Sequence, residues 1–196
     1  MQELITKKEL EELVNKLDNG IDKFILLGFY YGLNGSASYK EQLLNLEVDS
    51  VDFENKKIDL PDGREIIMDK LLEKICKEAV NQKIYIKLGS KGGTNEDYTL
   101  NPNSKYIIKV KPTKLTNNGL TPLKISGIKK RMSMISDYLG FNITANMLKV
   151  SGVYELLKNQ HKKMTIAEAE TLLKKNGMSI RKNNLIPILR ELNEQV

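Results

Sequence analysis

Residues 21–33, with the sequence IDKFILLGFYYGL, restrict the fold of this chain more than any other stretch. Their length suits a helix, and apolar side chains cover nearly the whole circumference that such a helix would have. A helix that is apolar all round is stable in water only when other elements surround it. We therefore expect residues 21–33 to form the central helix of the protein.

The flanking sequence alternates between helical and strand patterns. Thr6 and Glu9 have the spacing of a capping box, which predicts that a helix over 6–17 begins there. Further helices are predicted over 39–46, 69–83, 121–139, 144–160, 165–175 and 179–195. Strands are predicted over 50–59, 65–68, 84–88 and 105–110, with a turn at 61–63 and a Gly-rich surface loop over 89–103. The expected fold class is α+β: a single, mainly helical domain over residues 1–196 with a small antiparallel sheet.

Charge is distributed unevenly along the chain. Residues 1–97 carry 14 Lys and Arg against 19 Asp and Glu, whereas residues 98–196 carry 17 against 6, which gives net charges of −5 and +11. Between Tyr98 and Ser136 there is no acidic residue. The basic residues there are Lys105, Lys109, Lys111, Lys114, Lys124, Lys129, Lys130 and Arg131. A one-sided charge of this kind favours a polyanionic partner over plain solvation of a lysine-rich surface.

Several classes of function are disfavoured. Cys76 and His161 are the single cysteine and the single histidine, so an internal disulfide is excluded and a Cys/His zinc site nearly so. Cys76 follows the apolar stripe of a predicted helix and is expected to be a core residue. GSKGG (89–93) lacks the spacing of a phosphate-binding loop. No apolar run is long enough to span a membrane. We therefore expect no metal, no cofactor and no membrane partner.

Four segments share an order and a pattern with a known family. They are LLGFYYGL (26–33), KEQLLNLEVDSVDFENKKIDL (40–60), ITANMLKVSGVYELL (143–157) and LLKKNGMSI (172–180). Together they resemble the catalytic domain of tyrosine recombinases, the phage integrase family. In that family an apolar helix ends in a Thr-Gly-Leu-Arg-like turn, a later helix begins His-x-Leu-Arg-His, and a Leu-Gly-His-like turn precedes the nucleophilic Tyr.

The resemblance also implies that the active site has degenerated. The positions of the family's phosphate-activating residues are occupied by Tyr39, Asn146, Lys149, Val150 and Met178. The family also carries a lysine on its β-hairpin that helps to stabilise the phosphate. That lysine has no clear counterpart here, although Lys57 or Arg64 could reach the active site. No tyrosine follows Tyr154. A lysine keeps the charge of an arginine but not its bidentate fork. We therefore expect no catalytic residues and a recombinase fold without recombinase chemistry.

A chain of this fold that has lost its chemistry can still bind DNA. The resemblance implies that the helix matching 121–135 lies against the major groove of double-stranded DNA. Candidate groove contacts are Thr121, Lys124, Ser126, Lys129, Lys130 and Arg131. Candidate contacts with the phosphate backbone of the DNA are Lys111, Lys114 and Lys149. Ser36, Ser38, Tyr39 and Lys40, near the former active site, could also meet that backbone. The chain is similar to the integrase-like repressors that hold lysogeny in some temperate phages, which implies a place at the nucleoid in the cytoplasm of a bacterial host.

Two alternatives remain. One is an active or accessory recombinase with relocated residues, using Tyr154 or Tyr39. The other is a protein-interaction module that self-associates through the C-terminal helix, whose apolar stripe is Ile180, Leu185, Ile188, Leu189 and Leu192. The family also carries an N-terminal domain that closes a clamp around DNA, and this chain begins where the second domain begins. We expect DNA binding by this half alone to be weak and steeply salt-dependent.

Overall fold

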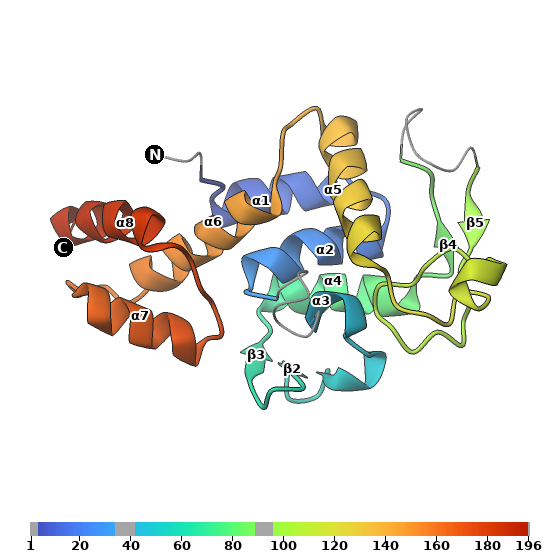
Figure 1. Ribbon diagram of the computed structural model, residues 1–196, viewed down its shortest axis with the longest axis horizontal. Helices are drawn as coiled ribbons and strands as arrows, with labels where there is room; N and C mark the ends of the chain where they lie inside the picture. The colour runs from blue at the N-terminus through green and yellow to red at the C-terminus, as the bar shows by residue number, and fades with distance from the viewer. Residues whose placement is uncertain (1–3, 34–41, 89–95, 196) are drawn as a thin grey trace.

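The helix predicted to be central is central in the structure. A computed structural model describes residues 4–33, 42–88 and 96–195. Of the eleven residues of α2 (Gly20–Tyr30), ten are buried, and the helix lies between α4 and α6 (Figure 1). The remaining elements, in chain order, are α1 (Lys7–Asn15), α3 (Gln42–Asn45), η2 (Val48–Ser50), β1 (Val51–Asp52), β2 (Lys57–Asp59), β3 (Glu65–Ile67), α4 (Lys70–Asn81), β4 (Ile84–Tyr85), β5 (Tyr98–Thr99), η3 (Lys114–Thr116), α5 (Ile125–Leu139), α6 (Ala145–Lys158), α7 (Ile166–Lys175) and α8 (Lys182–Gln195).

Helices dominate the described residues, and two small antiparallel sheets accompany them, which confirms the α+β fold class. The capping box at Thr6 is confirmed, since its hydroxyl accepts from the Glu9 amide and the Glu9 carboxylate accepts from the Thr6 amide. Cys76 is fully buried on α4, and burial raises the pKa of its thiol to about 12. The prediction that Cys76 is a core residue is thereby confirmed.

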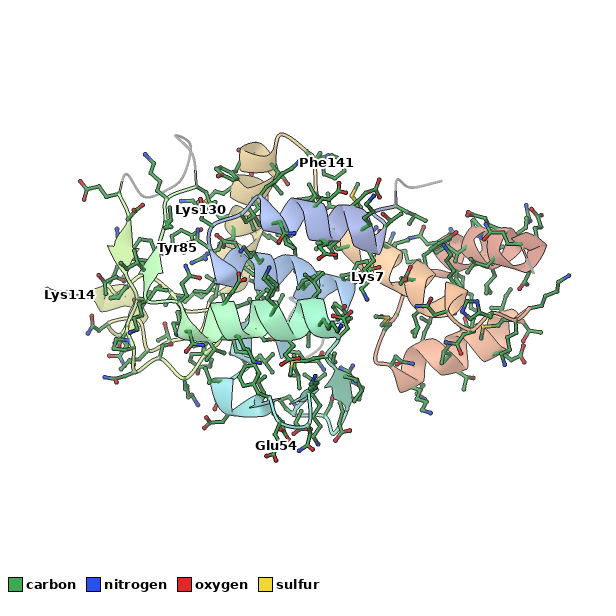
Figure 2. The ribbon with its side chains drawn as sticks, turned by 180° about the vertical axis from the view of Figure 1, so that it is seen from behind. Lys7, Glu54, Tyr85, Lys114, Lys130 and Phe141 are labelled. Carbon is green, nitrogen blue, oxygen red and sulfur yellow. The ribbon has the colours of Figure 1, made fainter. Side chains whose placement is uncertain are left out.

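The predicted hairpin is present in a three-stranded sheet of order β1-β2-β3. Ile58 pairs with Val51 on one side and with Ile66 on the other. All three side chains are buried, because residues paired directly across neighbouring strands project from the same face of the sheet. Glu54 lies in the β1–β2 turn, which projects from the lower side of the molecule as drawn in Figure 2.

The second sheet differs from the prediction. β4 pairs with β5, which lies inside the segment predicted to be a loop, and the strand predicted over 105–110 is wrong. Within that segment only Tyr106 makes a bridge, with Glu47. Ile107, Ile108 and Lys109 are all buried, so the side chains do not alternate between core and solvent. The Lys109 ammonium instead donates to the carbonyls of Val80 and Gln82, at 2.5 and 3.2 Å.

Two hydrophobic clusters fill the described part of the molecule. The larger surrounds α2, and the smaller joins the second half of α6 to α7 and α8. Figure 1 shows α7 and α8 at one end, with α6 running from them toward the middle. In α8 the apolar stripe Leu185, Ile188, Leu189 and Leu192 is buried in the chain's own smaller cluster. None of the described helices has the length and apolar character that crossing a membrane would require.

Candidate functional site

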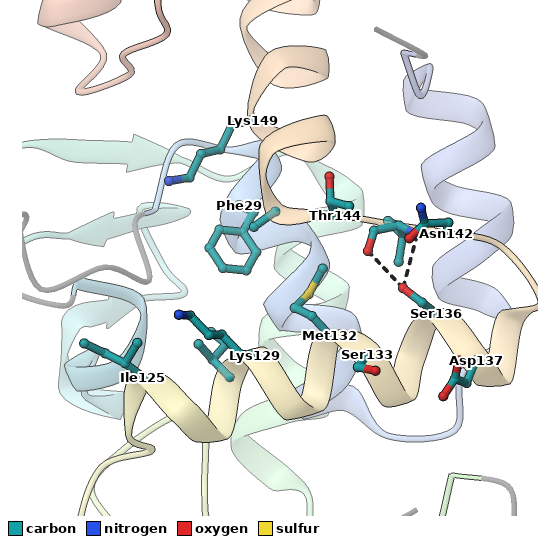
Figure 3. A pocket seen from close by; sticks show the side chains of 13 residues that line it. Phe29, Ile125, Lys129, Met132, Ser133, Ser136, Asp137, Asn142, Thr144 and Lys149 are labelled. Atoms are coloured by element: carbon teal, nitrogen blue, oxygen red, sulfur yellow. Dashed lines mark hydrogen bonds between the residues drawn. The ribbon is translucent and has the colours of Figure 1, made fainter. Parts of the chain in front are cut away.

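A groove of about 590 Å³ lies between α5 and the beginning of α6. Its apolar lining consists of side chains from α2, from α5 and from the start of α6 with the segment before it: Phe29, Ile125, Ile128, Met132, Ile143 and Ala145. Its polar lining consists of Lys129, Ser133, Ser136, Asp137, Asn142, Thr144 and Lys149. Figure 3 shows the Phe29 ring between Lys149 of α6 and Lys129 of α5, with both ammonium groups pointing toward the same side of the view. One end of the groove is therefore cationic.

The first turn of α6 positions Lys149. Thr144 begins the helix, because its hydroxyl accepts from the Met147 amide at 3.1 Å. Lys149 follows one turn later and is half-buried, with its ammonium 5.6 Å from the centroid of the Phe29 ring. This burial lowers the pKa of Lys149. The amide groups at the start of a helix add partial positive charge, so this corner of the groove suits an anion.

The other end of the groove is held by Ser136. Its hydroxyl donates to the carbonyl of Ile143 at 2.9 Å and accepts from the Ile143 amide at 3.2 Å (Figure 3). These two bonds tie α5 to the segment that leads into α6. The relative position of α5 and the start of α6 is thereby fixed at this end of the groove.

The outer face of α5 is basic. Lys124, Ser126, Lys129 and Lys130 are all exposed, as the predicted contact with a polyanion requires. The helix begins at Ile125 and not at Thr121. Thr121 precedes it in a non-helical segment, half-buried, and its hydroxyl donates to the carbonyl of Thr116 at 3.3 Å. Thr121 therefore does not lie on the helix face on which we expect the contacts with the major groove.

Arg131 requires a correction. Its side chain is 9% exposed, and its guanidinium forms an ion pair of 2.9 Å with Asp22, which is fully buried on α2. The guanidinium carbon also lies 4.4 Å from the centroid of the Tyr85 ring. Burial acts to lower the pKa of Arg131, but the neighbouring Asp22 carboxylate raises it above its ordinary value. The Arg131 side chain is buried and bound to Asp22 and Tyr85, so it cannot contact the major groove of DNA.

A sequence signal for this burial was available. Position 131 lies three residues after Ile128 and four before Ile135, both of which are buried. This spacing places Arg131 on the apolar stripe of the helix, whereas Lys129 and Lys130 fall beside it. The charge of Arg131 concealed its position, because charged residues are rarely buried.

The remaining basic residues between Tyr98 and α5 divide into two groups. Lys105 pairs with Glu47 at 2.5 Å, and Lys109 is internal. Lys111 and Lys114 are exposed, and the Lys111 ammonium lies 5.2 Å from the centroid of the Tyr98 ring. Both lysines are therefore accessible for the predicted contact with the phosphate backbone of DNA.

Some of the altered active-site positions lie close to one another. Met178 packs on Gly32, where a Cβ would lie 2.8 Å from the Met178 Cγ. Lys149 and Met178 both line a small cavity of about 20 Å³ together with Gly32. Val150 is 2% exposed and belongs to the smaller cluster, while Asn146 is exposed. Tyr39 and Lys40, with Ser36 and Ser38, lie outside the described residues.

The hairpin cation nearest to these positions is Arg64. Its guanidinium donates to the carbonyl of Asn176 at 3.4 Å and lies against Gly177, next to Met178. Lys57, the other candidate, is held on the sheet by Glu65 at 2.6 Å and Asp59 at 3.1 Å. In residues 4–33, 42–88 and 96–195, no group of three His, Cys, Asp or Glu side chains is arranged to hold a metal ion.

Comparison with known families gives a match over nearly the whole chain. The model described as the C-terminal catalytic domain of MrpR matches residues 4–195. This is an integrase-like, tyrosine-recombinase-like catalytic domain. A search of curated proteins finds no match.

Proposed function

Because this chain belongs to the MrpR C-terminal catalytic domain family, we propose that it binds double-stranded DNA without cutting it and acts as a transcriptional repressor that controls lysogeny in a phage or prophage. The proposal combines the binding of DNA with the absence of strand cleavage. Each rests on its own observations, and each has its own test.

One observation carries the binding of DNA: Lys129 of α5 and Lys149 of α6 line the same groove, beside the exposed Lys124 and Lys130. Four lysines on α5, its N-cap and α6 give this face a positive charge, and neutralising several phosphates of a nucleic-acid backbone is what such a set of lysines does. The exposed face of α5 offers lysine and serine side chains that can reach base edges in a major groove. Repression would follow from occupying a promoter.

The absence of cleavage is supported by what replaces the reactive groups. Tyr154, the last tyrosine of the chain, donates a hydrogen bond of 2.8 Å to Glu191 of α8. Burial and this bond raise the pKa of Tyr154, which disfavours the phenolate that attacks phosphorus. Val150 is in the core and Met178 offers a thioether, so neither can donate to a phosphate.

Binding is tested by fluorescence anisotropy with phage promoter duplexes over a range of salt concentrations. Lys129→Ala and Lys149→Ala should each weaken binding about five- to tenfold at 0.1 M salt and reduce the slope of log K against log salt by about one. Lys8→Ala is the matched control, because that side chain is 88% exposed on α1, in the acidic half of the chain. Equal effects of all three substitutions, or no binding by the unaltered chain at low salt, would refute the proposed interface.

Cleavage is tested with supercoiled plasmid and with 5′-labelled duplexes that contain the bound sequence. We expect neither nicked plasmid nor a covalent protein–DNA adduct after denaturation. An adduct that disappears in Tyr154→Phe or Tyr39→Phe would identify a relocated nucleophile and would make the protein a recombinase.

A further inference from the structure

Leu115 is almost completely exposed, with 91% of its surface accessible to solvent. It is the middle residue of the one-turn helix η3, which precedes α5 in the chain. Figure 1 places η3 at the edge of the molecule, on the β4–β5 side of α5, and Figure 2 shows the adjacent Lys114 pointing away from the body. A large apolar side chain is thus presented at an outer corner of the basic half.

The turn that carries Leu115 is held firmly. The Thr116 hydroxyl accepts from the Thr113 amide at 2.9 Å and donates to the Lys111 carbonyl at 2.7 Å. The Asn118 amide donates to the Thr113 carbonyl at 2.9 Å, and the Asn118 carbonyl accepts from the Asn101 side chain at 2.6 Å. These bonds fix the backbone on both sides of Leu115, so its exposure does not come from a frayed end.

The backbone after Leu115 has an unusual conformation. Asn117, Asn118 and Gly119 all have left-handed φ values, of 45°, 53° and 84°. A Cβ at Gly119 would lie 3.1 Å from Asn101 and 3.3 Å from the Val110 carbonyl, so only glycine fits there easily. A left-handed conformation is costly for the two asparagines and not for glycine, and the hydrogen bonds of the turn offset that cost.

The surroundings of Leu115 indicate its partner. Lys111, Lys114, Asn117 and Asn118 are exposed around it, and the sequence has no acidic residue between Tyr98 and Ser136. The apolar surface of Leu115, even together with Leu120, which is 40% exposed in the same turn, is far smaller than the apolar patch of a protein interface. Lysine and asparagine around one apolar side chain is, however, the composition with which proteins enter the minor groove and unstack adjacent base pairs.

We propose that Leu115 inserts between base pairs in the minor groove of the bound DNA and kinks it there, with Lys111 and Lys114 on the flanking phosphates. This inference rests on the proposed DNA binding. The insertion of Leu115 is a second contact with DNA, separate from the protein groove between α5 and α6. Its strength depends on how easily the DNA deforms and not on which bases the DNA presents.

The test measures affinity and DNA unwinding separately. Affinity is measured by anisotropy with a mixed-sequence 40-base-pair duplex, and unwinding by the topoisomer distribution of a plasmid relaxed by topoisomerase I in the presence of the 196-residue chain. Leu115→Ser should weaken binding between about tenfold and a hundredfold, as expected when burial of one leucine is lost, and should abolish the topoisomer shift. Ile67→Ser is the matched control, because Ile67 is 68% exposed on β3, beside Glu65, and should change neither quantity.

The outcomes separate the two proposals. If the unaltered chain binds no duplex at low salt, the proposed function fails. If it binds and Leu115→Ser leaves both the affinity and the topoisomer shift unchanged, the proposed function stands and the insertion is refuted. Lys114→Ala should weaken binding but keep the topoisomer shift, which would distinguish the leucine from its charged neighbour.

Discussion

At the scale of single residues, the ion pair between Arg131 and Asp22 shows how a charge is accommodated inside this protein. Asp22 accepts from Arg131 at 2.9 Å and from the Tyr85 hydroxyl at 2.8 Å, so both of its oxygens are occupied. Arg131 in turn lies on the Tyr85 ring, which favours a cation over its face. The pair joins α2, α5 and β4, the elements behind the basic face.

Removing one partner of this pair should be costly. Arg131→Met should lower the free energy of unfolding by about 3–5 kcal/mol, because it leaves the Asp22 carboxylate buried without a counter-charge. Urea denaturation measures the change. Lys130→Met, at the exposed neighbouring position, should stay within about 0.5 kcal/mol. In the double variant Asp22→Asn with Arg131→Met the loss should be smaller than the sum of the two single losses, since no charge remains buried. A loss below about 1 kcal/mol for Arg131→Met alone would contradict the importance of the pair.

At the scale of elements, the contact between α2 and α6 depends on one glycine. A Cβ at Gly152 would lie 1.8 Å from the carbonyl oxygen of Tyr30, at the end of α2. The two helices approach each other closely because Gly152 has no side chain. The contact lies one turn beyond Lys149, so it also sets where the start of α6 meets the groove.

Gly152→Ala should therefore destabilise the protein by about 3 kcal/mol, the upper part of the range for overpacking, because the obstacle is backbone and cannot rotate away. Gly127→Ala on α5 is the control. Its nearest neighbours are atoms of the flexible Leu123 side chain, and alanine is favoured over glycine in a helix by up to about 1 kcal/mol. The two substitutions should shift the melting temperature in opposite directions, and equal shifts would contradict this account of the α2–α6 contact.

At the scale of the whole molecule, the two hydrophobic clusters divide the protein unequally. The larger contains α2 and the apolar lining of the groove between α5 and α6, whereas the smaller holds α7 and α8 against the second half of α6. The stability of a region follows from the apolar surface that it buries, so the two regions should open with different free energies.

Native-state hydrogen exchange should show this difference. The amides of α7 and α8 should exchange through a sub-global opening at low denaturant, while those of α2 should exchange only on global unfolding. Mass spectrometry of peptides from the three helices measures both rates. If α2 and α8 exchanged with the same free energy and the same dependence on denaturant, the two clusters would form one cooperative unit.

Much of this protein could be predicted from the sequence, because the signals were local. The apolar run at 21–33 required a central helix, the Thr6–Glu9 spacing placed a capping box, and the turn at 61–63 placed a hairpin. The family resemblance also came from local motifs, and the integrase-like match over residues 4–195 agrees with it. The lysines of α5 were named as candidate DNA contacts from the family resemblance, and the absence of acidic residues around them favoured a polyanionic partner.

Tertiary structure alone decided which distant residues meet and which partners a buried charge finds. The sequence marks Arg131 and Lys109 as basic, but only their neighbours Asp22, Val80 and Gln82 make burial tolerable. β5 pairs with β4 across an intervening segment, and no local periodicity reports a partner at that distance. The groove of Lys129 and Lys149, and the fixed exposure of Leu115, likewise depend on contacts between segments far apart in the chain. Local propensity determines an element, whereas desolvation and packing, which depend on every neighbour in space, determine the site.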